Sequence, residues 1–207
     1  MILAERYQVI RPLAQGGFGK TFLACDRYLP GQPHCVIKQF LPLDITADAL
    51  QTAQRLFNLE AETLYKLGTH PQIPTLLAHF EQAGEFYLVQ AYISGETMAE
   101  ELRSLQIYGQ IYGQTSVCEQ NPSHEHYPSH EHYTFSLLQD LLSVLAFVHQ
   151  NGVIHRDVKP ENIIRHSQTQ RLVLIDFGAV KTMVTALSKD GAAHTISIGS
   201  RGYIAPE

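Results

Sequence analysis

The stretch VIHRDVKPENII, residues Val153–Ile164, decides how this chain is interpreted. It places two carboxylates, two cations, an amide and a histidine between short apolar ends. Asp157 can accept a proton, Lys159 supplies a cation, and Asn162 offers an amide oxygen suited to a hard metal. These are the parts that phosphoryl transfer needs. His155 is interpreted as a structural histidine whose hydrogen bonds are satisfied within the fold.

Three further groups of residues carry polar chemistry. The glycines of LAQGGFGK, Leu13–Lys20, lie between two expected strands and allow backbone N–H groups to approach a phosphate, although they also fit a plain hairpin. Lys38 interrupts an apolar strand, where it either pairs with Glu60 of the next helix or extends to water. In IDFG, Asp176 lies at the end of an expected strand. A carboxylate in this position is either a metal ligand or part of a turn.

The residue pattern predicts a mixed α+β fold. Apolar runs bounded by turn residues predict strands over Tyr7–Ala14, Thr21–Cys25, His34–Phe40, Thr75–Glu81, Glu85–Ile93 and Arg171–Gly178. Apolar spacings of three and four predict helices over about Thr46–Leu67, ended by Gly68, and Thr134–Asn151, ended by Gly152. We expect Ser136 and Gln139 to form a capping box on the second helix. We expect its apolar stripe to comprise Leu137, Leu138, Leu141, Leu145 and Val148.

A low-complexity insert separates these two halves of the chain. Between about residues 105 and 133 the sequence contains the duplications IYGQIYGQ and PSHEHYPSHEHY, which lack a helical period. We interpret the segment as a surface insert. Its four histidines have spacings that could bind Zn²⁺ or Ni²⁺, although a slippage repeat without function is the preferred explanation. They are His124, His126, His130 and His132.

The composition is that of a globular protein with a sizeable core. The chain has 207 residues, of which 44% are hydrophobic and 17% charged, and a formal net charge of -5. The acidic balance argues against a nucleic-acid partner. The three cysteines have no metal-site spacing and indicate reduced thiols. No apolar run reaches about 18 residues, so we expect no membrane segment and a cytoplasmic protein.

The order of these motifs resembles that of a known family. A glycine loop, a strand lysine, a helix glutamate, HRDVKPEN, DFG and APE follow one another as in protein kinases. The sequence resembles a Ser/Thr protein kinase of the bacterial, eukaryotic-like type over nearly its whole length except the insert. The resemblance implies a bilobal kinase domain over residues 1–207. Residues 1 to about 93 would form a small lobe with a five-stranded sheet and one helix. Residues of about 94–207 would form a mostly helical, incomplete large lobe.

The resemblance also implies a role for each matching residue. Asp157 would be the catalytic base, Lys159 would steady the transferred phosphate, and Lys38, paired with Glu60, would hold the α- and β-phosphates of ATP. Asn162 and Asp176 would hold Mg²⁺. The residues expected around ATP are Ala14, which replaces the family's first glycine, Gln15, Gly16, Gly17, Phe18, Gly19, Thr21, Val36, Lys38, the gatekeeper Gln90, the hinge residues Ala91 and Ile93, and Ile164. Glu60 is preferred to Glu62, which helical spacing turns about 200° away.

The remaining expectations concern regulation by phosphorylation and the part of the kinase fold that follows APE. Arg156 could pair with a phosphate on the loop 179–200. The candidate acceptors in that loop are Thr182, Thr185, Ser188, Thr195 and Ser197. Because kinases continue with several helices after APE, we expect Glu207 to lack its arginine partner and the chain alone to be marginally stable.

Three functional hypotheses follow from the resemblance. The chain could belong to an ATP-dependent kinase acting on Ser or Thr of a protein, or it could be a nucleotide-binding or interaction fragment without turnover. It could also be a small-molecule phosphotransferase, which the segment GSRGYIAPE disfavours.

Overall fold

The computed structural model describes residues 1–16, 19–40, 47–104, 130–178 and 181–182. Several predictions therefore lie outside the described residues. They concern Gly17, Phe18, His124, His126, Thr185, Ser188, Thr195, Ser197, Glu207 and most of the insert.

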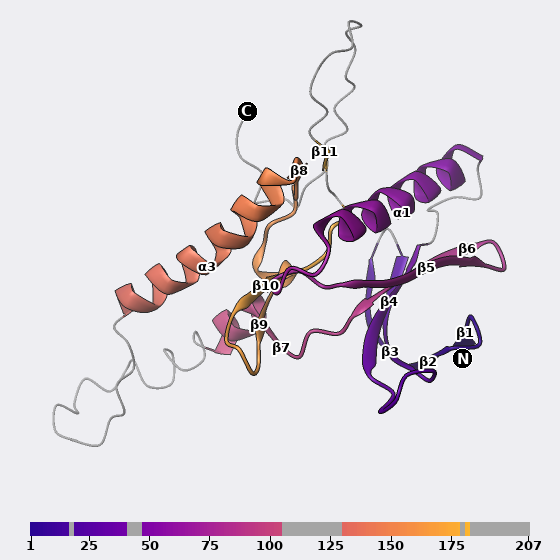
Figure 1. The fold of residues 1–207 in the computed structure, drawn as a ribbon, viewed down its shortest axis with the longest axis horizontal. Helices are drawn as coiled ribbons and strands as arrows, with labels where there is room; N and C mark the ends of the chain where they lie inside the picture. Colours follow the sequence, from indigo (N-terminus) through magenta and orange to yellow (C-terminus); the bar gives the residue numbers. More distant parts are fainter. Residues whose placement is uncertain (17–18, 41–46, 105–129, 179–180, 183–207) are drawn as a thin grey trace, which may run out of the picture.

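The N-terminal half forms a curled antiparallel sheet (Figure 1). Its order is β1-β2-β3-β4-β6-β5. The strands are β1 (Ile2–Leu3), β2 (Tyr7–Gly16), β3 (Gly19–Asp26), β4 (His34–Phe40), β5 (Leu76–Gln82) and β6 (Glu85–Ala91). The five predicted strands are present, and β1 is a sixth that the sequence did not indicate. It pairs with β2 through a turn at Ala4 and Glu5, whose φ angles of 47° and 55° lie in a region more typical of Gly or Asn.

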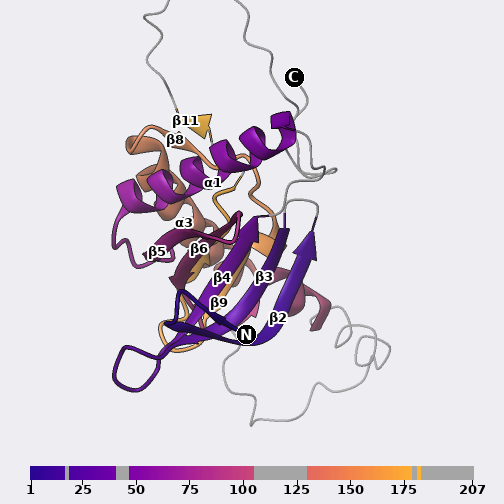
Figure 2. The same ribbon diagram turned by 90° about the vertical axis from the view of Figure 1, so that its right-hand side faces the viewer.

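Helix α1 (Ala47–Leu67) lies across this sheet, as Figure 2 shows. Its apolar side is buried through Phe57, Ala61 and Leu64, which recur with helical spacing. Gly68 ends the helix in the left-handed region at φ +62°, and its N–H donates to the carbonyl of Leu64. The predicted helix and its glycine stop are thus present, apart from Thr46, which is not among the described residues.

The second half combines helices with short strands. The strands are β7 (Gly95–Thr97), β8 (Val153–Ile154), β9 (Ile163–His166), β10 (Leu172–Leu174) and β11 (Lys181–Thr182). Strands β10, β9 and β7 form one sheet, and β11 pairs with β8. A helix over 98–104, α3 (His130–Gln150) and the 3₁₀ turn η1 (Pro160–Asn162) complete the described part.

Three sequence expectations in this half are corrected. Helix α3 begins at His130, so the predicted insert ends earlier, and Ser136 lies inside the helix rather than capping it. A capping box does occur at Thr97, where Thr97 and Glu100 exchange hydrogen bonds of 2.8 and 3.2 Å. The strand predicted over Arg171–Gly178 is limited to β10, because the backbone turns at Asp176 with φ 65°.

The apolar stripe of α3 differs from the predicted one at Leu138, and it also includes Val144. Val144 and Val148 are fully buried, whereas Leu138 is 48% exposed. Leu137, Leu141 and Leu145 pack partly against the core, so most of the predicted stripe is covered in the described structure.

One hydrophobic core joins the two halves. It contains side chains from α1, from α3 and from β10, including Leu64, Val148 and Leu174. In Figure 1, β9 and β10 lie between α3 and the sheet, with α1 above the sheet. This common core brings Asp176, which follows β10, close to Glu60 on α1. None of the helices in the described ranges is long and apolar enough to span a membrane.

The shared core generates a stability prediction. Leu64 is 1% exposed, so Leu64→Ala should lower the free energy of unfolding by about 2–5 kcal/mol through lost burial and a residual cavity. Leu142→Ala is the matched control, because this leucine of α3 is 61% exposed, and its effect should stay within about 0.5 kcal/mol. Urea unfolding followed by circular dichroism measures both. Equal losses would contradict the shared core.

Candidate active site

The glycine-rich hairpin connects β2 and β3. Gly16 pairs with Gly19 and Ala14 with Thr21, which in turn pairs with Lys38 on β4. Gly19 has φ +145°, and a Cβ there would lie 1.9 Å from the carbonyl oxygen of Gln39. Only glycine fits this close approach of β3 to β4. Gly19 therefore has a packing role in addition to the phosphate approach expected from the sequence.

Lys38 lies between two carboxylates from different parts of the chain. Its Nζ is 2.5 Å from Glu60 Oε1 on α1 and 2.8 Å from Asp176 Oδ1 after β10. The side chains of Lys38, Glu60 and Asp176 are 15%, 1% and 45% exposed. Glu60, rather than the exposed Glu62, faces the lysine. We call these three residues the charge cluster.

The pKa shifts follow from this geometry. Burial lowers the pKa of Lys38, but Glu60 and Asp176 outweigh that effect and raise it above the usual lysine value. Lys38 lowers the pKa of Asp176. Burial raises the pKa of Glu60, which Lys38 and a backbone N–H of Phe177 oppose. One ammonium thus faces two carboxylates, so the cluster has one negative charge in excess. Asp176 is the carboxylate with access to solvent, whereas Glu60 is buried.

The loop within Val153–Ile164 forms a second cluster. Lys159 Nζ is 2.8 Å from Asp157 Oδ2. The Nδ2 amide of Asn162 donates to the same Oδ2 at 2.8 Å and to the Asp157 carbonyl at 2.9 Å. These contacts fix the orientation of the Asp157 carboxylate. Because both donations use the Asn162 nitrogen, its Oδ1 is the atom left to act as an acceptor.

His155 connects the second cluster to the segment that carries Asp176. Its Nδ1 accepts from the Asp157 N–H at 3.3 Å, so the neutral ring donates from Nε2 to the Ile175 carbonyl at 3.1 Å. The ring packs edge-on against Phe177 with centroids 4.7 Å apart. Burial lowers the pKa of His155, in keeping with the neutral form. The structure therefore gives this histidine the satisfied, structural environment that the sequence favoured.

Backbone contacts complete the junction between the two clusters. The Ile175 N–H donates to the Asn162 carbonyl at 2.9 Å, and Ile163 pairs with Leu174. Arg156 and Asp176 both have positive φ, 68° and 65°, which is uncommon for non-glycine residues and frequent at functional sites. Asp157 and Asp176 are thus placed by one strand pair and one histidine.

The oxygen atoms offered here fit a hard divalent cation. Asp176 contributes a carboxylate and Asn162 an amide oxygen, which Mg²⁺ accepts when substrate oxygens and water fill its remaining positions. Among the described ranges no group of three or more His, Cys, Asp or Glu could hold a metal by itself. Of the four histidines in the insert, His130 and His132 fall in the first turn of α3.

The residues expected around adenine lie on adjacent elements. Val36 on β4 pairs with the buried Gln90 on β6, which ends at Ala91. The Ala91 N–H donates to the carbonyl of Thr75, the residue before β5, at 2.9 Å. Ile93 follows in the connection to β7, and Ile164 pairs with Thr97 and Val173. Ala14 and Gln15 are exposed on β2. Thr182, a candidate phosphate acceptor, pairs with Val153 through β11.

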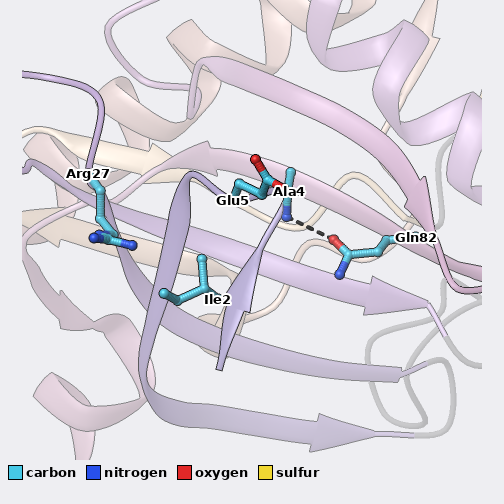
Figure 3. A pocket seen from close by; sticks show the side chains of 5 residues that line it. All are labelled: Ile2, Ala4, Glu5, Arg27 and Gln82. Carbon is cyan, nitrogen blue, oxygen red and sulfur yellow. Dashed lines mark hydrogen bonds between the residues drawn. The ribbon is translucent and has the colours of Figure 1, made fainter.

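Sequence reasoning did not single out three polar residues that connect the halves. Gln72, Asp140 and Arg171 hydrogen-bond one another between the α1–β5 connection, α3 and the start of β10. Their separation in the sequence gave no local motif that could have revealed them. A hollow of about 680 Å³ also occurs at the N-terminal turn, lined by Ile2, Ala4, Glu5, Arg27 and Gln82 (Figure 3). It shares no residue with the clusters described above.

Comparison with known proteins agrees with the fold. Residues 7–207 match the family described as protein kinase domain. Serine/threonine-protein kinase B of Synechocystis sp. is 39% identical over 99% of this chain and 33% of its own length. Serine/threonine-protein kinase PknA of Nostoc sp. is 37% identical over 100% of this chain and 33% of its own length. Serine/threonine-protein kinase PrkC of Bacillus subtilis is 28% identical over 99% and 27%.

A strand lysine paired with a helix glutamate, beside an Asp–Lys–Asn loop, is an arrangement typical of protein kinases. This chain belongs to the protein kinase family. It spans about a third of the length of the curated bacterial relatives that it matches.

The charge cluster generates a pH-dependent prediction. Lys38→Met leaves the buried Glu60 facing Asp176 without a cation, which should cost about 3 kcal/mol of stability near neutral pH. The pKa of Glu60 should then rise further. A carboxyl pKa that is higher in the folded state favours folding as pH falls through it, so the loss should shrink from about pH 8 to about pH 5.

The double variant Lys38→Met with Glu60→Gln is the control for this prediction. It lacks the titrating group at position 60, so its stability should not recover in the same way when acid is added. Urea unfolding across the pH range measures both variants. A pH-independent loss in Lys38→Met would contradict the account of Glu60.

Proposed function

We propose that this chain contains the catalytic site of an ATP-dependent Ser/Thr kinase that transfers the γ-phosphate of Mg-ATP to a protein hydroxyl. The observation that carries the proposal is the position of Lys38 between Glu60 and Asp176, next to the Asp157–Lys159–Asn162 loop. Family membership supports phosphotransfer to proteins. The use of ATP and Mg²⁺ and the role of each residue are our proposal.

The residues of the chain would divide the work by their chemistry. Lys38 holds the α- and β-phosphates, and Glu60 keeps its ammonium in position. Asp157 accepts the proton of the substrate hydroxyl. The oxygen of that hydroxyl bonds to the γ-phosphorus as the bond from this phosphorus to the β,γ-bridging oxygen breaks. Lys159, which contacts Asp157, offsets negative charge on the transferred group. The products are a phosphorylated protein and ADP.

Asn162 and Asp176 would hold the magnesium. Asp176 keeps an exposed carboxylate despite its contact with Lys38, and Asn162 is held with its nitrogen on Asp157. A bound Mg²⁺ would neutralise phosphate charge and orient the γ-phosphate for in-line transfer. Val36, Gln90, Ala91, Ile93 and Ile164 would surround the adenine, and the β2–β3 hairpin would cover the phosphates.

The proposal predicts a loss of turnover without a loss of nucleotide binding. Asp157→Asn keeps the shape of the side chain but removes the proton acceptor, so kcat should fall by about 100-fold or more. The dissociation constant for Mg-ATP should change little, because Asp157 does not hold the nucleotide. Phosphate transfer from labelled ATP to dephosphorylated casein measures kcat, and calorimetry measures binding.

Glu161→Gln is the matched control in the same loop, because Glu161 is exposed and has no proposed role. Its turnover should equal that of the unsubstituted chain. Binding of Mg-ATP by the unsubstituted chain without any transfer would support the nucleotide-binding fragment instead. Phosphorylation of small hydroxyl compounds but of no protein would contradict the proposed substrate class.

A further inference from the structure

Gln72 is a fully buried polar side chain that the proposed chemistry does not use. It is 0% exposed and lies in the connection between α1 and β5. Its Nε2 lies 3.0 Å from each of three acceptors, which are the Asp140 carbonyl, Asp140 Oδ1 and the Leu172 carbonyl. Its Oε1 accepts from Arg171 Nη2 at 2.8 Å. A buried amide with this many partners strongly constrains the backbone that carries it.

Asp140 and Arg171 extend the contacts of Gln72 to α3 and β10. Arg171 donates to Asp140 Oδ1 from Nε at 3.0 Å and from Nη2 at 2.9 Å. The Leu172 N–H donates to Asp140 Oδ2 at 2.5 Å. The Leu174 N–H donates to the backbone carbonyl of Gln72 at 2.9 Å. We call Gln72, Asp140 and Arg171 the polar lock.

The polar lock lies between the segments that deliver the two carboxylates of the charge cluster. Glu60 lies on α1, whose last residue, Leu67, is buried in the common core only a few residues before Gln72. Asp176 follows Leu174 by two residues. At 1.5 Å of rise per residue, Glu60 lies about 10 Å along α1 from the helix end. A rigid helix transmits a displacement at that end to Glu60.

We propose that Gln72 is a positioning residue that, through Asp140 and Arg171, sets the separation of Glu60 and Asp176 around Lys38. The inference rests on the proposed function, because the separation matters for turnover only if this cluster holds the phosphates. Gln72 does not touch the reacting atoms. Its loss changes the placement of Glu60 relative to Asp176 while the residues proposed around adenine stay in place.

The first experiment measures kinetics of the full chain well below its unfolding temperature. Gln72→Ala should lower kcat about tenfold with a smaller change in KM for ATP, because a small misplacement of reacting groups costs turnover.

The control removes a different ion pair of the second half. Arg165 Nε is 2.9 Å from Glu101 Oε2, and this pair joins β9 to the helix over 98–104. Glu101→Gln should lower stability without changing kcat per folded molecule. If Gln72→Ala also leaves kcat per folded molecule unchanged, Gln72 has a structural role only and the proposal is wrong.

A second measurement does not depend on activity. Substitutions at distant independent sites have additive effects on stability, whereas coupled sites do not. If the polar lock positions the charge cluster, Lys38→Met should cause a smaller loss in the Gln72→Ala background than in the unsubstituted chain. Absence of turnover in the unsubstituted chain would contradict the proposed function alone. Additive losses would contradict the polar lock whether or not the chain is active.

Discussion

The position of the Lys38 ammonium is the constraint on which the rest of the structure depends. A charge at 15% exposure is costly unless opposite charges lie close to it. The two carboxylates come from α1 and from the segment after β10, so the contact is satisfied only when the sheet, the helix and the second half are all assembled. Folding of both halves is thereby coupled to the formation of one electrostatic cluster.

The neighbouring structure supports this cluster in two ways. The common core brings α1, α3 and β10 together through apolar contacts, which are not directional and do not fix the positions of the charged groups. Directional contacts then fix the polar groups, through His155 between Asp157 and Ile175 and through Gln72 between Asp140 and Leu172. Stability and positioning are therefore supplied by different residues, which the proposed experiments separate.

Much of this arrangement could be predicted from the sequence. Residues with a local signature were placed well, such as the strand around Lys38 and the helix around Glu60 ended by Gly68. Contacts between distant segments have no such signature, which is why Gln72 was missed. Strand β1 was missed because its turn uses Ala4 and Glu5 instead of the usual turn residues. The start of α3 was misplaced because a Ser-x-x-Gln pattern also occurs inside helices.

The most direct test of the central claim is turnover of Mg-ATP by the 207-residue chain beside its Asp176→Ala variant. The account predicts measurable transfer of phosphate to protein by the unsubstituted chain and a loss of at least about 100-fold in the variant, because the proposed magnesium ligand and the second carboxylate at Lys38 are removed together. Equal turnover of the two proteins would contradict the claim that the charge cluster is the site of phosphoryl transfer.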